Sequence, residues 1–258
     1  IQAFLDRRRP GQSRYTTKRS ETDQVEILSG IFEGKTTGTP ISLLVRNQDQ
    51  RSRDYGEIAS CYRPGHADYT FQNKYGFRDY RGGGRTSGRE TIGRVAAGAV
   101  ASALLKTLGI KLTAFSKSIG PVTVPESEYR LDEVTENPLY MPNNGLAKKA
   151  ADYLNEMMEQ KDSCGGIIEC RVTGLPVGLG EPVFDKLDAQ LSKGIMSIGA
   201  VKAVEIGDGF LAAASNGSTN NDAFAVQDGQ MIKRTNHSGG VLGGISDGSE
   251  LIVRAAIK

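Results

Sequence analysis

Ser87-Gly88-Arg89-Glu90, followed by the largely apolar run Thr91–Leu108 and by Gly109, is the stretch that decides the fold. Residues 95–101 are small and apolar on nearly every side, which predicts a buried helix over 90–108. Gly109 is a typical residue for the end of a helix. Ser87 and Glu90, three positions apart, fit a capping box at its start. The sequence therefore predicts a helix that lies inside the fold.

A glycine-rich segment precedes this helix, and one of only two histidines lies just upstream of it. The two stretches are Arg63-Pro64-Gly65-His66-Ala67-Asp68 and Tyr80-Arg81-Gly82-Gly83-Gly84-Arg85-Thr86. Histidine titrates near neutral pH, so His66 can exchange protons. Glycine backbone N–H groups, helix N-termini and arginines all bind anions. The combination predicts a site that binds a phosphorylated ligand and moves a proton.

The glycine run fits neither of two common phosphate-binding motifs. No Gly-Lys-Ser/Thr follows it, as in a P-loop, and no apolar strand precedes it, as in dinucleotide-binding folds. A tight turn without a ligand therefore remains the alternative interpretation of residues 82–84.

Arginine is concentrated in the first part of the chain. Residues 1–94 contain 14 of the 18 arginines but 3 of the 14 lysines, with 17 basic and 11 acidic residues. Residues 95–258 contain 15 basic and 19 acidic residues. Because arginine binds carboxylates and phosphates in a bidentate manner, this distribution favours an anion site. Ordinary surface charge or nucleic-acid binding is the alternative, although no nucleic-acid-binding module is recognisable.

The rest of the chain mixes strands and helices without strict alternation. We expect strands over 25–32, 40–46, 110–120, 167–172, 200–206 and 251–257, the first two forming a hairpin, and helices over 147–159 and 184–196. Residues 121–144 are polar with four prolines and predict a loop with short turns, whereas residues 207–235 are polar and rich in Asn, Asp and Gly. Residues 47–88 show no period, but seven aromatics, Tyr55 among them, favour order. The pattern predicts an α/β fold of the α+β type with a largely antiparallel sheet.

Several classes of protein are disfavoured. No apolar run approaches the roughly 18 residues of a membrane helix, and no signal-peptide pattern is present. Cys61, Cys164 and Cys170 lack metal-type spacing, so we expect free, buried thiols in a reducing cytoplasm and no metal site. We expect His237, beside a second glycine cluster, to form a hydrogen bond within its loop.

Six runs of the sequence closely resemble the chorismate synthase family. They are Asp6-Arg7-Arg8-Arg9-Pro10-Gly11, Leu28-Ser29-Gly30-Ile31-Phe32-Glu33-Gly34, Arg63-Pro64-Gly65-His66-Ala67-Asp68, Asp79-Tyr80-Arg81-Gly82-Gly83-Gly84-Arg85, Gly178-Leu179-Gly180-Glu181-Pro182-Val183-Phe184-Asp185 and Gly239-Gly240-Val241-Leu242-Gly243-Gly244-Ile245-Ser246. The resemblance runs in order through the chain and is weakest over 115–165.

The resemblance implies a fold and an activity. The fold would be a β-α-β sandwich, with helices packed between largely antiparallel sheets, assembled as a homotetramer. The activity would be the 1,4-anti-elimination of phosphate from 5-enolpyruvylshikimate 3-phosphate to give chorismate, which needs reduced FMN without net redox change. Whether NADPH or an outside reductant reduces the flavin stays open. Neither nucleic acid nor membrane would be a partner.

The resemblance also implies roles for single residues. His66 matches a functional histidine, and we expect it to donate a proton to the leaving phosphate. Arg8 and Arg14 match arginines of the anionic pocket that bind NADP in some members, and Arg89 should reach the substrate. The expected flavin contacts are Arg85, Thr86, Ser87, Gly199, Ala200, Gly243 and Lys258.

Two family motifs, Gly-Glu-Ser-His-Gly and Arg-His-Asp-Pro, are absent from residues 1–258, and residue 199 is glycine where many members have asparagine. We therefore expect a single chorismate synthase domain that lacks N-terminal and C-terminal segments and is inactive as residues 1–258 alone. Two other interpretations remain. One is a flavin-dependent oxidoreductase acting on a phosphorylated substrate, and the other is an arginine-rich RNA-binding module.

Overall fold

The computed structural model describes residues 1–17, 19–48 and 57–258. Tyr55, one of the aromatics that favour order, lies outside the described residues. The chain divides into two compact units, residues 1–104 and 105–258. Every strand pair in the described part is antiparallel. This confirms the predicted α+β class with antiparallel pairing, while the packing of helices between sheets stays a prediction.

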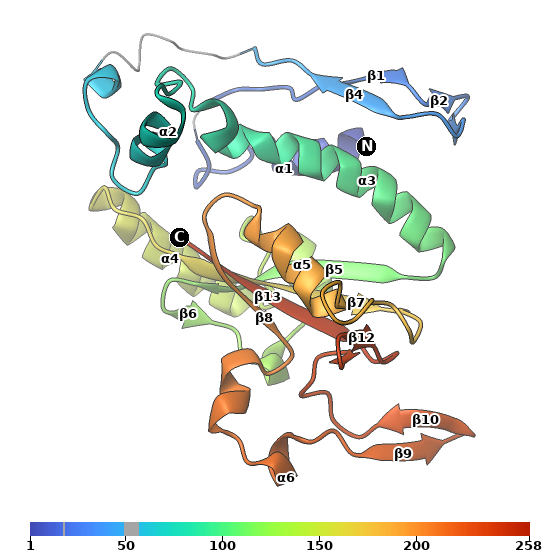
Figure 1. Ribbon diagram of the computed structural model, residues 1–258. Coiled ribbons are helices and arrows are strands. Elements are labelled where there is room, and N and C mark those ends of the chain that lie inside the picture. The colour runs from blue at the N-terminus through green and yellow to red at the C-terminus, as the bar shows by residue number, and fades with distance from the viewer. Residues whose placement is uncertain (18, 49–56) are drawn as a thin grey trace. The chain divides into compact units, whose positions relative to one another are not determined.

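A long hairpin and three helices form the first unit (Figure 1). Its elements are α1 Gln2–Arg8, β1 Val25–Ser29, β2 Ile31–Phe32, β3 Lys35–Thr36, β4 Ser42–Val45, α2 Asp68–Tyr75 and the greater part of α3 Thr91–Thr107. Strand β1 pairs with β4, and β2 pairs with β3 at the tip, which confirms the predicted hairpin. Gly30 has φ +83°, and a Cβ there would lie 2.7 Å from Ile41 Cα, so this bend requires glycine. Helix α2 lies in the segment for which no element was predicted.

Helix α3 begins almost where the sequence predicts, but its cap and its burial differ. The 3-10 turn Gly88–Glu90 precedes it, and Ser87 Oγ accepts a hydrogen bond from the Arg89 N–H at 3.2 Å. The capping box does not form, because the Glu90 carboxylate accepts a hydrogen bond from Arg94 at 3.1 Å instead. The prediction of all-round burial is wrong, since only Ala96 and Ala99 are buried among its residues.

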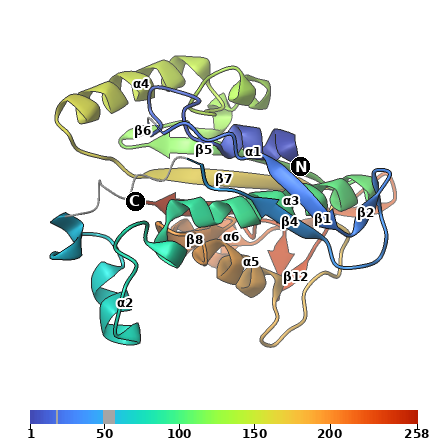
Figure 2. The ribbon, with the colours of Figure 1, turned by 90° about the horizontal axis from the view of Figure 1, so that it is seen from above.

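A five-stranded sheet is the centre of the second unit. Its order is β6 Val122–Thr123, β5 Lys111–Ile119, β7 Gly166–Thr173, β13 Leu251–Ile257 and β8 Val201–Ile206. Helix α4 Asn144–Glu159 contacts β6 and helix α5 Leu187–Met196 contacts β8, at opposite ends of the strand order (Figure 2). The core comprises Ile110, Val172, Val241, Leu251 and Val253. The four long strands and both helices are confirmed predictions.

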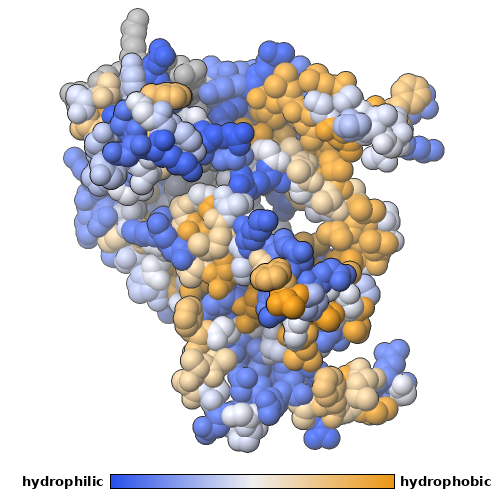
Figure 3. Space-filling view, viewed as in Figure 1, coloured by the Kyte–Doolittle hydropathy of each residue, from blue (hydrophilic) through white to orange (hydrophobic). Residues whose placement is uncertain are grey.

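Two short hairpins and several helical turns complete this unit. The remaining elements, turns of both units included, are β9 Phe224–Gln227, β10 Gln230–Lys233, β11 Val241–Leu242, β12 Ile245–Ser246, α6 Gly217–Asn220, and the 3-10 turns Glu57–Ala59, Gly84–Thr86, Glu126–Glu128, Leu131–Thr135 and Gly209–Ala214. The β9–β10 hairpin lies within residues 207–235, for which no element was predicted. Its apolar side chains are exposed, as the lower right of Figure 3 shows.

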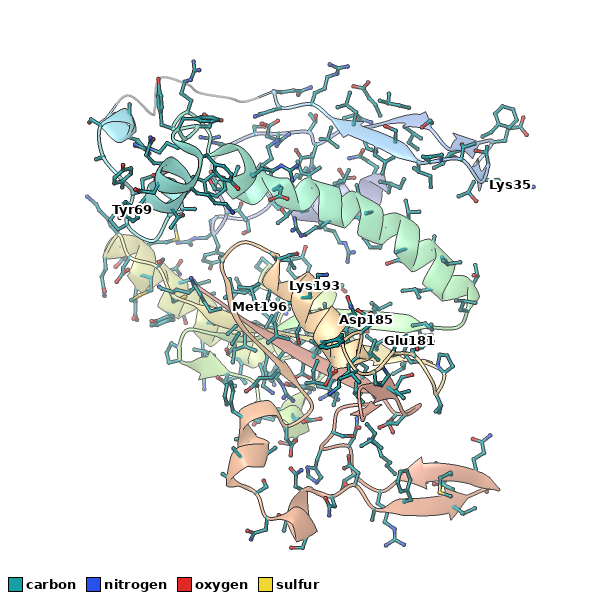
Figure 4. The ribbon with its side chains drawn as sticks, viewed as in Figure 1. Lys35, Tyr69, Glu181, Asp185, Lys193 and Met196 are labelled. Carbon is teal, nitrogen blue, oxygen red and sulfur yellow. The ribbon has the colours of Figure 1, made fainter. Side chains whose placement is uncertain are left out.

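Two further expectations need correction. Helix α5 begins at Leu187 rather than at Phe184, because Glu181 and Asp185 form a backbone bridge that holds the preceding residues in a turn (Figure 4). Phe184 is 89% exposed. The three cysteines are free, but Cys61 is exposed and the other two are half-buried. In the part of the chain that the structure describes, no helix is long and apolar enough to cross a membrane.

Candidate functional site

A pocket of about 460 Å³ in the first unit gathers the arginines of the N-terminal segment. Its charged lining consists of Arg8, Arg9, Arg19, Arg81, Arg89 and Glu21. Asn47, two threonines, Ser87 and the glycines at 82 and 88 supply further polar and backbone groups. Five guanidinium groups facing one carboxylate produce a positive potential that attracts anions. The pocket lies between α1 and the start of α3, where its charge suits the predicted anion site.

Some of the predicted site residues line this pocket, and others do not. Arg8, Ser87 and Arg89, predicted from different parts of the sequence, line it together. Arg14 is exposed, stacks on the Tyr15 ring with its guanidinium carbon 5.6 Å from the centroid, and does not line the pocket. Arg85 is exposed as well, 3.8 Å from the Glu90 carboxylate.

Two buried acids were not predicted from the sequence: Glu21, which lines the pocket, and Asp23, which lies behind two of its arginines. Asp23 is fully buried, and its Oδ2 accepts a hydrogen bond of 2.8 Å from Arg8 Nη1. Its Oδ1 lies 2.9 Å from Arg89 Nη1. Glu21, 6% exposed, lies 3.6 Å from the same nitrogen. Their position in the sequence could have indicated a role, because both acids stand within a strongly basic segment, where they are suited to pair with arginines.

The glycine loop forms a tight turn beside the pocket. Gly83 is buried with φ +80°, and a Cβ there would lie 2.7 Å from Thr86 Oγ1 and 3.6 Å from the His66 ring. The Thr86 hydroxyl donates to the Gly83 carbonyl oxygen at 2.6 Å. The loop therefore has no room for a side chain at Gly83, and it brings His66 next to the segment that was predicted to bind phosphate.

A second hollow, of about 550 Å³, adjoins the first and shares Asn47, Gly82, Ser87 and Arg89 with it. Its other walls are largely apolar and come from β4 and from the first turns of α3. The arginine pocket and an apolar surface are therefore neighbours in this unit.

His66 contacts a buried carboxylate through its Nδ1 atom. Asp68 Oδ1 lies 3.0 Å from this nitrogen, and Arg63 Nη2 lies 3.2 Å from it. Asp68 also accepts hydrogen bonds from Arg63 Nε at 2.7 Å and Nη2 at 2.8 Å. These bonds from Arg63 hold the pKa of the Asp68 carboxyl well below its usual range. Arg63 Nη2 can only donate, so it binds Nδ1 when that atom carries no proton, whereas a protonated Nδ1 donates to Asp68. The Nε2 atom takes part in neither contact and is the ring nitrogen available for proton exchange.

The predicted flavin contacts of the second unit fall into two sets. Lys258 N–H donates to the Ala200 carbonyl oxygen at 3.0 Å, and Ala200, next to Gly199, has φ +72°. Gly199 and Ala200 follow the end of α5, and Lys258 follows β13. Gly243 belongs to the β11–β12 turn, whose next residue, Gly244, accepts a hydrogen bond from Leu187 at the start of α5. The helix has 10 residues and spans about 15 Å, so the structure keeps the two sets apart.

The second histidine has a structural environment. His237 Nδ1 lies 2.7 Å from Asp208 Oδ2, and its backbone N–H donates to Asp222 at 2.8 Å. This confirms the expected loop hydrogen bond. Within the described ranges, no group of three or more histidine, cysteine, aspartate or glutamate side chains could hold a metal ion.

Comparison with known proteins gives one consistent result. The family model described as chorismate synthase matches residues 1–258. Proteins named chorismate synthase from Agathobacter rectalis and Lachnoclostridium phytofermentans are 64% and 63% identical over the whole chain, which covers 70% and 71% of those proteins. A solved structure described as "Crystal Structure of Chorismate Synthase" has a TM-score of 0.79 at 34% identity and covers 92% of this chain and 70% of that chain.

Proposed function

The chain belongs to the chorismate synthase family, and on this premise we propose that the whole protein eliminates phosphate from 5-enolpyruvylshikimate 3-phosphate to give chorismate. The observation that carries the proposal is the five-arginine pocket, next to a glycine loop that holds a histidine. The substrate has two carboxylates and a phosphate. Such charges can be brought together only where several cations share the site. The reaction is a step of aromatic amino acid biosynthesis, for which we propose a cytoplasmic location.

The donor set of the first unit fits a flavin mononucleotide. The phosphate of FMN needs guanidinium and hydroxyl or N–H donors, and the segment Arg85-Thr86-Ser87 before α3 supplies the exposed Arg85 guanidinium and the Ser87 hydroxyl. The Thr86 and Ser87 N–H groups already donate to the Gly83 and Gly84 carbonyl oxygens. Reduced FMN, when bound, supplies an electron-rich group beside the substrate and is not consumed by the elimination. We propose that the sets around Ala200 and Gly243 in the second unit also hold flavin.

The side chains of this chain would perform the remaining steps. Arg8 and Arg89 bind the carboxylate and phosphate oxygens of the substrate, because planar guanidinium groups match both. Asp68 fixes the orientation of His66, and the Nε2 atom of His66 holds the proton that is delivered to the leaving phosphate. A general acid of this kind contributes about 10²–10⁴-fold to the rate.

Two finer features are part of the proposal. Arg14, exposed beside Tyr15, is available to bind the phosphate of NADPH if that nucleotide reduces the flavin. A homotetramer is expected of the family, and exposed apolar side chains such as Phe224 and Met231 are available for contacts between subunits.

An anaerobic assay of the full-length protein tests the proposal. The protein is incubated with 5-enolpyruvylshikimate 3-phosphate and chemically reduced FMN, and chorismate and phosphate are measured together. We expect equal amounts of the two products, with the flavin still reduced at the end. Consumption of reducing equivalents with each turnover would instead favour the flavin-dependent oxidoreductase. Absence of both products with bound flavin would overturn the proposed substrate.

A further inference from the structure

Asp23 connects the two arginines that line the pocket from different elements. Arg8 belongs to α1, and Arg89 to the turn before α3, 81 positions later. One carboxylate oxygen of Asp23 binds Arg8 Nη1 at 2.8 Å, and the other lies 2.9 Å from Arg89 Nη1. The side chains of the two arginines are 19% and 23% exposed, whereas that of Asp23 is fully buried. The acid is therefore behind the arginines, on the side away from solvent.

Other contacts fix the remaining edges of both guanidinium groups. Arg8 Nε donates to Thr91 Oγ1 at 3.1 Å, and Arg8 Nη2 donates to the Gly88 carbonyl oxygen at 3.3 Å. Arg89 Nη2 donates to the Arg46 carbonyl oxygen at 3.0 Å. A guanidinium group has five N–H donors, so each arginine keeps donors for a ligand after these contacts are made.

The backbone at Asp23 has a conformation that few residues other than glycine adopt, although aspartate tolerates it better than most. Its φ of +46° lies in the left-handed region, and Gln2 holds the segment in place. Gln2 Nε2 donates to the Asp23 carbonyl oxygen at 3.2 Å, and Gln2 Oε1 accepts from the Val25 N–H at 3.0 Å. Such an outlier persists only where its surroundings impose it, and it is a frequent feature of functional sites.

We propose that Asp23 is a positioning residue, which holds Arg8 and Arg89 in the orientation that binds the anionic substrate. This inference rests on the proposed function, because it names the residue that organises the substrate-binding arginines. Five like charges in one pocket repel each other, and long side chains lose conformational freedom when a ligand immobilises them. A buried carboxylate shared by two of them reduces both costs before the substrate arrives.

The test is the Asp23→Asn variant of the full-length protein, assayed with 5-enolpyruvylshikimate 3-phosphate and reduced FMN. A group displaced by about 1 Å can cost about 100-fold, so we expect KM to rise by about 10- to 100-fold, with a smaller fall in kcat. Substrate binding measured by calorimetry should weaken by the same factor. The control is Glu26→Gln, which removes an exposed partner of Arg46 and should leave KM unchanged.

A merely structural role would give a different pattern. If Asp23→Asn lowered only the folded fraction, the apparent kcat would fall in proportion and KM would stay at the wild-type value, which would overturn the inference. The effect on KM should also shrink in an Arg8→Gln background, because Asp23 acts through this arginine. Full additivity of the two substitutions would contradict it.

Two further experiments test the inference if the Asp23→Asn variant does not fold or the wild-type protein does not bind the substrate. If Asp23→Asn does not fold, Asp23→Glu takes its place, since it keeps the charge but moves the carboxylate, and a wild-type KM would then overturn the inference. If the wild-type protein neither binds nor converts the substrate, the proposed function fails instead. In that case the affinity for inorganic phosphate tests the role of Asp23 independently of the substrate. We expect Asp23→Asn to bind phosphate more weakly than the wild type, and equal affinity would contradict the inference.

Discussion

At the scale of single residues, His66 differs from a surface histidine because of the group behind it. Its Nδ1 faces the buried Asp68 carboxylate, which two nitrogens of Arg63 keep ionised. We expect His66→Ala in the full-length protein to lower kcat by about 10²–10⁴-fold, the contribution of a general acid. Binding of FMN and substrate should change little, because the arginines remain. Stopped-flow and equilibrium binding measure the two quantities, and near-wild-type turnover would exclude the assigned role.

Asp68 also makes the stability of the fold dependent on pH. Its pKa is lowered in the folded protein by hydrogen bonds from Arg63, whereas an unfolded aspartate titrates near 4. The resulting stabilisation is therefore complete above about pH 4 and is lost as the pH falls towards the folded pKa. We expect the stability difference between wild type and Asp68→Asn, from urea unfolding, to shrink as the pH falls from about 5 to 3. A constant difference would contradict this origin.

At the scale of elements, the turn Gly83–Thr86 depends on a glycine for two separate reasons. We expect Gly83→Ala to destabilise the protein by about 1–2 kcal/mol for the left-handed backbone alone, and by more because its Cβ would contact Thr86 and the His66 ring. Turnover should fall as the ring moves. Gly34→Ala is the matched control, because it has φ +75° but open space around the new Cβ. Equal stability losses in thermal unfolding would show that the contacts do not matter.

The sequence predicts helices and strands well where burial of one face spaces the apolar residues regularly, and poorly where it does not. The four long strands of the five-stranded sheet and the long helices follow apolar patterns, and they were predicted within a few residues, whereas the two-residue strand β6 was not predicted. Helix α2 has no apolar face, and the β9–β10 hairpin carries its apolar residues Phe224, Val226 and Met231 on exposed surface, so neither pattern was recognisable. These elements depend on turns and local hydrogen bonds that a hydrophobic period does not report.

The residues of the candidate site were likewise only partly predictable from the sequence. Arginines and glycines were predictable because their number and spacing are unusual, and Arg8, Ser87 and Arg89 do share a pocket. Asp23 stands between Thr22 and Gln24 without any pattern, and its importance arises from burial and from two partners distant in sequence. A lone acid of this kind becomes visible only when the chain is folded.

At the scale of the whole molecule, a buried ionic cluster links three strands of the five-stranded sheet. Glu169 on β7 is fully buried and contacts Lys117 on β5, Arg171 on β7 and Arg254 on β13. Burial raises the pKa of Glu169, but hydrogen bonds from Arg171 and Arg254 and the charge of Lys117 outweigh it, so the pKa is lowered overall. This carboxylate is the common partner of three cations.

Removal of the Glu169 charge should therefore lower the stability of the fold. We expect Glu169→Gln to lower the free energy of unfolding by about 3–5 kcal/mol, because Lys117 and Arg254 lose their counter-charge, whereas Arg171 keeps Glu126 and Glu250. Chemical denaturation measures it. Glu26→Gln, which breaks the exposed pair with Arg46, should leave the midpoint unchanged. Similar midpoints for both variants would show that the cluster does not stabilise the sheet.

The position of β13 within this sheet has a consequence for synthesis of the protein. The strand lies between β7 and β8, and its Arg254 pairs with Glu169, 85 residues earlier in the chain. While the ribosome is translating residues 174–250, β7 has an open edge where β13 will insert, and β8 has one as well once residues 201–206 have been made. At roughly 5–20 residues per second, this interval lasts several seconds. Unpaired strand edges promote aggregation, so we expect the nascent chain to be prone to aggregation during this interval.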